Sequence, residues 1–168
     1  MKSRRHHFNS ICYTVFLIAV TNFAVGQNYA IIPNDSIEIT GVLEDLQTLS
    51  IQQENAISDT IYLGWEKVSA IVPEFWEASV CDNSLCYASL LDSGLMNPVF
   101  PGEYGLLLIH CTPHVMGGTA IIRYCVWDLS DPDNKDTLTY TLHVITTETI
   151  DGNPQNNNVW VANRTPRF

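Results

Sequence analysis

Residues Thr119–Asp128 read TAIIRYCVWD, and this stretch decides the fold class. Its side chains fall into two alternating sets. One set is apolar or aromatic throughout, and the other contains Arg123, which places that set nearer to solvent. The members of the apolar set are Ala120, Ile122, Tyr124 and Val126. Alternation with a period of two residues is the pattern of a β-strand with one buried face.

The next patterned stretch, Thr137–Ile145, repeats this alternation more regularly. Its apolar side chains alternate with three threonines and with His143, so that one face of the strand is polar. Residues 129–136, LSDPDNKD, lie between the two stretches and are rich in turn formers. The pattern predicts that these two strands form a hairpin.

Five further β-rich segments precede these two, and no long stretch has helical periodicity. The expected strands are Ser36–Leu43, Thr48–Gln53, Thr60–Val68, Trp76–Val80 and Tyr104–Cys111. Seven strands in about 110 residues is the number found in an immunoglobulin-like domain. We therefore predict an all-β fold, an immunoglobulin-like antiparallel β-sandwich of about seven strands.

The first 26 residues have the three parts of a secretory signal peptide. Basic residues precede an apolar run from Ile11 to Val25, and cleavage after Gly26 leaves Gln27 as the first mature residue. Two polar residues interrupt the run, which is shorter than the roughly 20 apolar residues of a spanning helix. We expect a secreted or cell-surface protein without a membrane span after cleavage, with the periplasm as the alternative destination.

The predicted organisation has four parts. A signal peptide (1–26) and an N-terminal leader (27–35) precede the sandwich (36–146), and a polar tail (147–168) follows it. We expect this tail to be disordered, because residues 151–158 are too polar to be buried.

The mature chain is strongly acidic. Three of the eight basic residues leave with the signal peptide, which leaves five against eighteen acidic residues, a formal charge of −13. The five are scattered along the chain. Since phosphate neutralisation needs clustered Lys and Arg, nucleic-acid binding is excluded.

Four cysteines remain after cleavage. Cys81 and Cys86 flank a turn-forming stretch, and we predict that they form a disulfide in an oxidising compartment. If the strands that contain Cys111 and Cys125 form a hairpin, the two residues lie roughly 20 Å apart, well beyond disulfide range. We therefore predict no bond between them.

The string Cys111, His114, Met116 contains the ligand types of a blue-copper site. Such a site needs a second imidazole. His110 adjoins Cys111 and points to the opposite face of an extended strand, and His143 is expected on the wet face of its own strand. We predict that the protein binds no copper. A zinc site from the same histidines and Cys111 lacks the usual ligand spacing.

Two weaker binding interpretations remain. Asp128, Asp131, Asp133 and Asp136 lie in or beside one loop and offer hard oxygen ligands for calcium, although acidic loops between strands are usually solvated. Aromatic side chains offer a sugar-binding face, although core packing is the commoner use of Trp in a sandwich. These aromatic residues are Trp65, Trp76, Tyr87, Trp127 and Trp160.

Several strings resemble an immunoglobulin-like module of uncharacterised secreted proteins of Bacteroidota. The most specific is the Cys-Asp-Asn-x-x-Cys-Tyr element at 81–87, and the resemblance covers roughly Ser36–Ile145. Shorter matches are Gly64–Val68, Pro73, Trp76, Pro101–Glu103, Gly105, His110, Pro113, Gly118–Thr119, Val126–Asp128, Pro132 and Asp136–Leu138. Proteins with this module often end in a sorting domain of the type IX secretion system, whereas this sequence offers only Val159–Phe168 after Asn158.

The resemblance implies no catalytic residue, and the sequence contains neither a nucleophile elbow nor a zinc-protease motif. We therefore expect a non-catalytic module with a structural, adhesion or interaction role at the cell envelope. Its partner would be a protein or a glycan, and no cofactor is expected. The alternatives are a glycan- or calcium-binding module and a copper-binding electron carrier.

Overall fold

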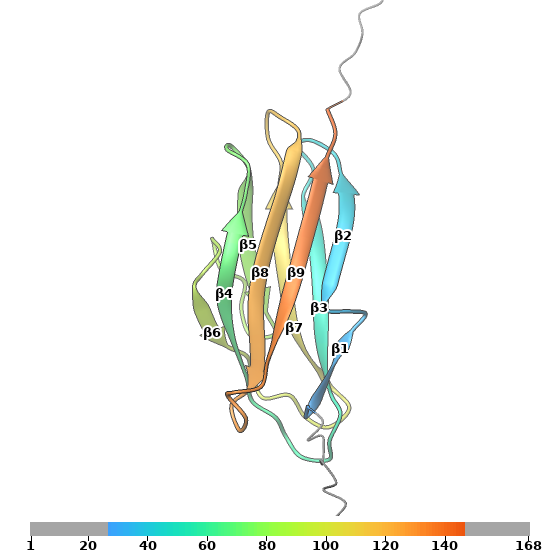
Figure 1. Ribbon diagram of the computed structural model, residues 1–168, viewed down its shortest axis with the longest axis vertical. Helices are drawn as coiled ribbons and strands as arrows, with labels where there is room; N and C mark the ends of the chain where they lie inside the picture. Colours follow the sequence, from blue (N-terminus) through green and yellow to red (C-terminus); the bar gives the residue numbers. More distant parts are fainter. Residues whose placement is uncertain (1–26, 147–168) are drawn as a thin grey trace, which may run out of the picture.

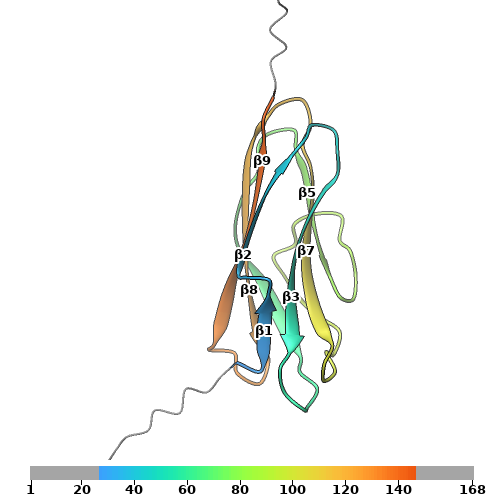
Figure 2. The ribbon, with the colours of Figure 1, turned by 90° about the vertical axis from the view of Figure 1, so that its right-hand side faces the viewer.

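The structure, a computed structural model, describes residues 27–146 as two β-sheets packed face to face (Figure 1, Figure 2). The strands are β1 (Tyr29–Ile32), β2 (Ser36–Gly41), β3 (Gln47–Asn55), β4 (Leu63–Ile71), β5 (Glu77–Asp82), β6 (Ser93–Leu95), β7 (Tyr104–Thr112), β8 (Gly118–Asp128) and β9 (Lys135–Val144). The first sheet has the order β1-β3-β7-β5 and the second β2-β9-β8-β4-β6. The predicted all-β sandwich is confirmed.

All seven expected segments form strands, with ends shifted by a few residues. Two short strands were not predicted. β1 lies in residues 27–35, the expected leader, and pairs with β3. β6 has three residues and pairs with β4, where the backbone of Gly94 lies against the ring of Trp65 and leaves no room for a side chain. Strands this short contain too few residues to show a period of two.

The predicted hairpin is confirmed, since β8 pairs antiparallel with β9 along its whole length. The core-facing side chains of both strands are buried, as the alternation predicts. They are Ala120, Ile122, Tyr124 and Val126 from β8 and Leu138, Tyr140, Leu142 and Val144 from β9.

One strand pair differs from the antiparallel expectation. β2 pairs with β9 in parallel, with Ser36 opposite Thr139 and Gly41 opposite Val144. The reason lies in residues 33–35, where the chain crosses from the first sheet to the second after β1 (Figure 2). β1 and β2 therefore form edge strands of different sheets.

The expected hairpin between the strands of Cys111 and Cys125 is wrong. β7 belongs to the first sheet and β8 to the second, so residues 113–117 cross between the sheets. The two thiols are nevertheless free. Cys111 points into the core, whereas Cys125 alternates with the core-facing Tyr124 and contacts the Glu66 carbonyl on the outer side of its sheet. They are unbonded because they face different sides of the second sheet.

The predicted disulfide between Cys81 and Cys86 is present and closes a turn at the end of β5. Asp82, buried within this turn, accepts hydrogen bonds through Oδ1 from the backbone N–H groups of Ser84 (2.8 Å) and Leu85 (3.0 Å). Its Oδ2 accepts hydrogen bonds from Trp65 Nε1 (2.9 Å) and the Tyr87 hydroxyl (3.2 Å). Burial raises the pKa of Asp82, but hydrogen bonds from the Ser84 hydroxyl, the Ser84 and Leu85 backbone N–H groups and the Trp65 indole outweigh it and hold the pKa below its ordinary value.

Trp65 links this turn to the second sheet. It belongs to β4, is completely buried, and packs edge-to-face against Tyr87 (5.8 Å between centroids) and Tyr124 (5.6 Å). The hydrogen bond from its indole to Asp82 therefore joins β4 in one sheet to β5 in the other.

The predicted signal peptide (1–26) and polar tail (147–168) lie outside the described residues. Within residues 27–146, no helix is long and apolar enough to cross a membrane.

We expect Asp82→Asn to lower the free energy of unfolding by about 2 kcal/mol, because an NH₂ group would meet donors that converge on a carboxylate. Urea denaturation of the oxidised protein measures this loss. Asp92→Asn is the matched control. The Asp92 side chain is 92% exposed and pairs with Lys67, so its loss should cost under about 1 kcal/mol. Equal losses in the two variants would show that the Asp82 hydrogen bonds are not a major source of stability.

Candidate functional site

Three loops meet at the end of the sandwich where β9 finishes (Figure 1, Figure 2). They are residues 42–46 between β2 and β3, 72–76 between β4 and β5, and 113–117 between β7 and β8. We call this set of loops the loop end. Backbone contacts tie the loops together, since Glu44 N donates to Pro113 O at 2.8 Å.

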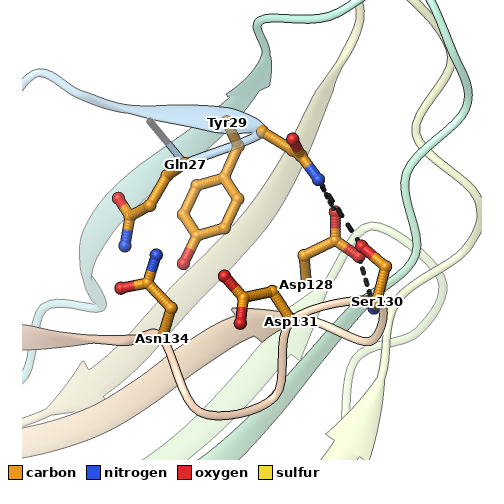
Figure 3. A pocket seen from close by; sticks show the side chains of 7 residues that line it. Gln27, Tyr29, Asp128, Ser130, Asp131 and Asn134 are labelled. Atoms are coloured by element: carbon orange, nitrogen blue, oxygen red, sulfur yellow. Dashed lines mark hydrogen bonds between the residues drawn. The ribbon is translucent and has the colours of Figure 1, made fainter. Parts of the chain in front are cut away.

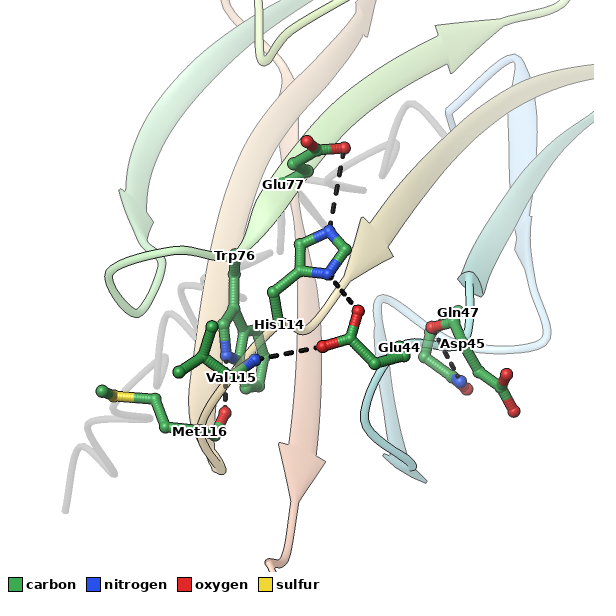
Figure 4. A network of polar contacts seen from close by, with 8 residues as sticks. All are labelled: Glu44, Asp45, Gln47, Trp76, Glu77, His114, Val115 and Met116. Atoms are coloured by element: carbon green, nitrogen blue, oxygen red, sulfur yellow. Dashed lines mark hydrogen bonds and ion pairs between the residues drawn. The ribbon is translucent and has the colours of Figure 1, made fainter.

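The Glu44 carboxylate contacts loop 113–117, which crosses between the two sheets (Figure 4). Oε2 lies 2.6 Å from His114 Nδ1, and Oε1 accepts a hydrogen bond from Val115 N at 3.2 Å. His114 Nε2 lies 4.0 Å from Glu77 Oε2, so the ring is placed between two carboxylates. The hydrogen bond from His114, followed by that from the Val115 backbone, lowers the pKa of Glu44. Glu44 thus remains a carboxylate and holds loop 113–117 from its exposed side.

Trp76 anchors the same loop from beneath. Its ring is almost fully buried, and its Nε1 donates to Met116 O at 2.9 Å. Gly118 lies against Pro73 and the Trp76 ring. Loop 72–76 therefore supports loop 113–117, and both are attached to the core through one indole.

The backbone of the loop end is strained. In the part of the chain that the structure describes, three residues other than glycine have positive φ, namely Glu44 (63°), Phe75 (68°) and Val115 (65°). One lies in each of the three loops. A β-branched residue such as Val115 is a genuine outlier there, because its side chain crowds the backbone. Such strain persists only where surrounding contacts enforce it, and it is concentrated at functional sites.

The strained loops expose apolar side chains to solvent. These side chains, between 42% and 75% exposed, are Val42, Leu46, Phe75, Val115, Met116 and, just after β9, Ile145. A cavity of about 200 Å³ opens beside them and is lined by Leu46, Glu77 and His110 among others. Contiguous exposed apolar surface marks interaction sites in soluble proteins. The arrangement suits contact with another surface, and its charged groups serve to hold the loops.

The structure does not bring the copper-ligand string together. The Cys111 side chain lies in the core, and burial raises the pKa of its thiol to about 11. His114 is engaged with Glu44 and Glu77, and Met116 is exposed on the loop. The histidine suggested for zinc, His143, contacts Thr119 and Glu38. Within residues 27–146, no group of three or more His, Cys, Asp or Glu side chains is placed to hold a metal.

The aspartates suggested for calcium lie at the opposite end of the sandwich, at or near a cavity of about 300 Å³. Figure 3 shows the side chains that line this cavity. Asp128 and Asp131 line it together with Gln27, Asn28, Tyr29, Ser130 and Asn134. Asp133 is exposed, and Asp136 belongs to β9. The four carboxylates therefore do not converge on one point.

Local hydrogen bonds hold the carboxylate of Asp128. It accepts from Asn28 Nδ2 and from the Ser130 backbone N–H, both at 2.8 Å. Burial raises its pKa, but these bonds outweigh the effect, so the pKa lies below its ordinary value. Tyr29 donates its hydroxyl to Val126 O at 3.1 Å, and the buried Oδ2 of Asp136 has no hydrogen-bond partner among the described residues.

The aromatic residues suggested for sugar binding serve mainly in packing. Trp65 and Trp76 are buried, and Tyr87 packs on Trp65. Trp127 lies under the ammonium group of Lys135, which is 4.0 Å from the ring centroid. Trp160 lies outside the described residues. These residues do not form one exposed aromatic face.

Comparison with solved structures places this geometry among known folds. The structure of the N-terminal domain of PorA aligns with a TM-score of 0.56 and 15% identity, covering 68% of this chain and 91% of that domain. The fold is an immunoglobulin-like sandwich. An ASH / PapD-like domain of human CEP192 aligns with a TM-score of 0.42 and 17% identity, over 71% of this chain and 85% of that one. No protein-family model and no curated protein matches the sequence.

Sequence reasoning missed the two residues that shape the loop end. Glu44 lies just beyond a predicted strand, and Phe75 just before another. Neither residue type favours positive φ, so no turn signal was present. The string from Cys111 to Met116 did point to loop 113–117, but it was considered there as a set of copper ligands.

We expect Glu44→Gln to lower the thermal midpoint at neutral pH and to have little effect in acid. The folded pKa of Glu44 lies below its ordinary 4.5, so its contribution is present above that pH and is lost as the pH falls through the folded value. The gap between wild type and variant should therefore close from roughly pH 6 to pH 3. Glu54→Gln, on exposed β3 surface, is the control. A gap that persists in acid would contradict the role of the carboxylate.

Proposed function

We propose that this protein is an exported, non-catalytic interaction module that binds a protein partner at the cell envelope through its loop end. One observation carries the proposal: the exposed apolar side chains stand on three strained loops that a polar network holds in place. Positive φ at residues other than glycine lowers the stability of the domain. Such strain is expected to persist where the surface that it presents serves a function.

Two independent features support export. The first 26 residues have the pattern of a signal peptide. The Cys81–Cys86 disulfide requires an oxidising compartment to persist. The resemblance of the sequence to modules of secreted Bacteroidota proteins points the same way. The destination we propose is the cell surface, with the periplasm as the alternative.

The titratable groups of the loop end support a binding role over catalysis. Glu44, His114 and Glu77 pair with one another, and the Val115 backbone takes the remaining acceptor of Glu44. Both carboxylate oxygens of Glu44 are engaged by loop 113–117, whereas a catalytic site would direct such a group at a substrate. The polar network therefore acts on the loop itself.

A glycan is the second candidate ligand, favoured by the cavity of about 300 Å³ at the opposite end. Its amides, carboxylates and single phenol are groups that hydrogen-bond to sugar hydroxyls. Asp131→Ala should abolish any glycan binding by the mature protein on a glycan array, and unchanged binding would exclude this cavity as the site.

Paired phenylalanine variants test the loop end. Phe75 is 56% exposed at the loop end, and Phe100 is 54% exposed at the opposite end. In an affinity pull-down from envelope proteins of the source organism, the immobilised wild-type protein and the Phe100→Ser variant should retain the partner. The immobilised Phe75→Ser variant should not retain it. For a purified partner we expect Kd to rise about tenfold, the effect of one moderate contact residue. Retention of the same proteins by both variants would show that binding occurs elsewhere.

Relief of the strain should separate stability from binding. Val115→Gly removes the side chain that crowds a positive φ and should raise the free energy of unfolding by up to about 1 kcal/mol. The same change should weaken partner binding several-fold, because the exposed isopropyl group is lost. Val42→Gly, at a residue of the same loop end that does not have positive φ, should instead lower the free energy of unfolding. A Val115→Gly protein that is less stable than wild type would contradict the strain.

A further inference from the structure

The chain leaves the described domain at the loop end. Val144 is the last residue of β9, and the backbone of Gly117 packs so closely on Val144 O and Thr146 N that a side chain would not fit there. Ile145, which lies between Val144 and Thr146, is 75% exposed. The described chain therefore ends beside loop 113–117.

The sequence of those residues has two parts. Residues 147–158, TETIDGNPQNNN, are mainly polar, and residues 159–168 read VWVANRTPRF. The second part combines an apolar triplet around Trp160 with Arg164 and Arg167, and contains no acidic residue. A spacer of twelve residues can extend to roughly 40 Å, enough to reach any part of the loop end.

The loop end is complementary to this second part in both respects. It offers exposed apolar side chains, and its loops and the first residue of β5 contain four exposed acidic residues but no Lys or Arg. The acidic residues are Glu44, Asp45, Glu74 and Glu77. His114 is the one basic side chain in the three loops.

We propose that residues 159–168 dock on the loop end of their own chain, with Trp160 on the apolar side chains and the two arginines beside the carboxylates. A second copy fits less well, because its loop end would bring like charges together. The inference rests on the proposed function, since it names the first occupant of the same surface. An external partner would compete with the chain's own segment for this surface.

Photo-crosslinking in the full mature chain tests the docking. Trp160 is replaced by p-benzoylphenylalanine, which keeps an aromatic side chain, and crosslinked peptides are identified by mass spectrometry. We expect monomeric products joined to residues 72–77 or 113–117, in a yield independent of protein concentration. The same probe at Asn153, in the spacer, is the positional control and should give scattered products. Crosslinked dimers, products elsewhere on the sandwich, or no product would overturn the inference.

Charge reversal provides a second readout. Arg164→Glu with Arg167→Glu should lower the yield at the loop end several-fold, and Phe75→Ser should do the same, while Phe100→Ser should not. Equal yields in all these variants would contradict docking at the loop end.

The outcomes separate this inference from the proposed function. A failed crosslink together with loss of partner binding in Phe75→Ser would leave the binding face standing and remove its internal occupant. A crosslink at the loop end together with unchanged partner binding in Phe75→Ser would support the internal occupant and show that the external partner binds elsewhere. If both hold, Trp160→Ala should raise the affinity for the partner several-fold.

Discussion

The hydrogen bond from the Trp65 indole to the Asp82 carboxylate is the interaction on which the rest of the domain depends. Face-to-face sheets are held mainly by apolar contact, which is not directional. A buried charged acceptor adds direction, because its donors must be present in one geometry. Asp82 gathers donors from its own turn, from Tyr87 and from the opposite sheet. The disulfide at its side keeps that turn closed. Asp82 therefore helps to fix the relative position of the two sheets, together with the hydrogen bonds from Tyr29 to Val126 O and from Tyr140 to Leu107 O.

The two ends of the sandwich use carboxylates in different ways. At the end that contains Tyr29 and the β8–β9 turn, polar side chains surround a cavity, and the carboxylate of Asp128 is satisfied by neighbouring N–H groups. At the loop end, the carboxylate of Glu44 is used to hold a backbone in an unfavourable conformation, and the side chains presented are apolar. A carboxylate thus stabilises an ordinary turn at one end and a strained loop at the other.

The sequence was sufficient for seven of the strands and for the β8–β9 hairpin, and insufficient for the other strand pairings. A period of two identified the buried faces of β8 and β9, because it depends only on which face of a strand meets the core. The sheet to which each strand belongs depends on the crossing of residues 113–117, which periodicity does not encode. The Cys-Asp-Asn-x-x-Cys-Tyr element signalled a disulfide, yet the role of Asp82 became visible only with Trp65 placed beside it. At the loop end, Phe75 and Val115 adopt backbone conformations against their own preferences. A prediction based on the conformational preferences of residue types therefore misses these two residues.

The parallel pairing of β2 with β9 bears on how the domain responds to mechanical force. The described chain enters at one end of the sandwich and leaves at the other (Figure 1). Tension applied through both termini would pull β2 and β9 in opposite directions along their common axis. Their six register pairs, from Ser36–Thr139 to Gly41–Val144, would then be loaded together in shear, whereas an antiparallel hairpin pulled from its open end is loaded one pair at a time. A protein held between two attachments would gain from this geometry, since forced unfolding is governed by the unfolding rate.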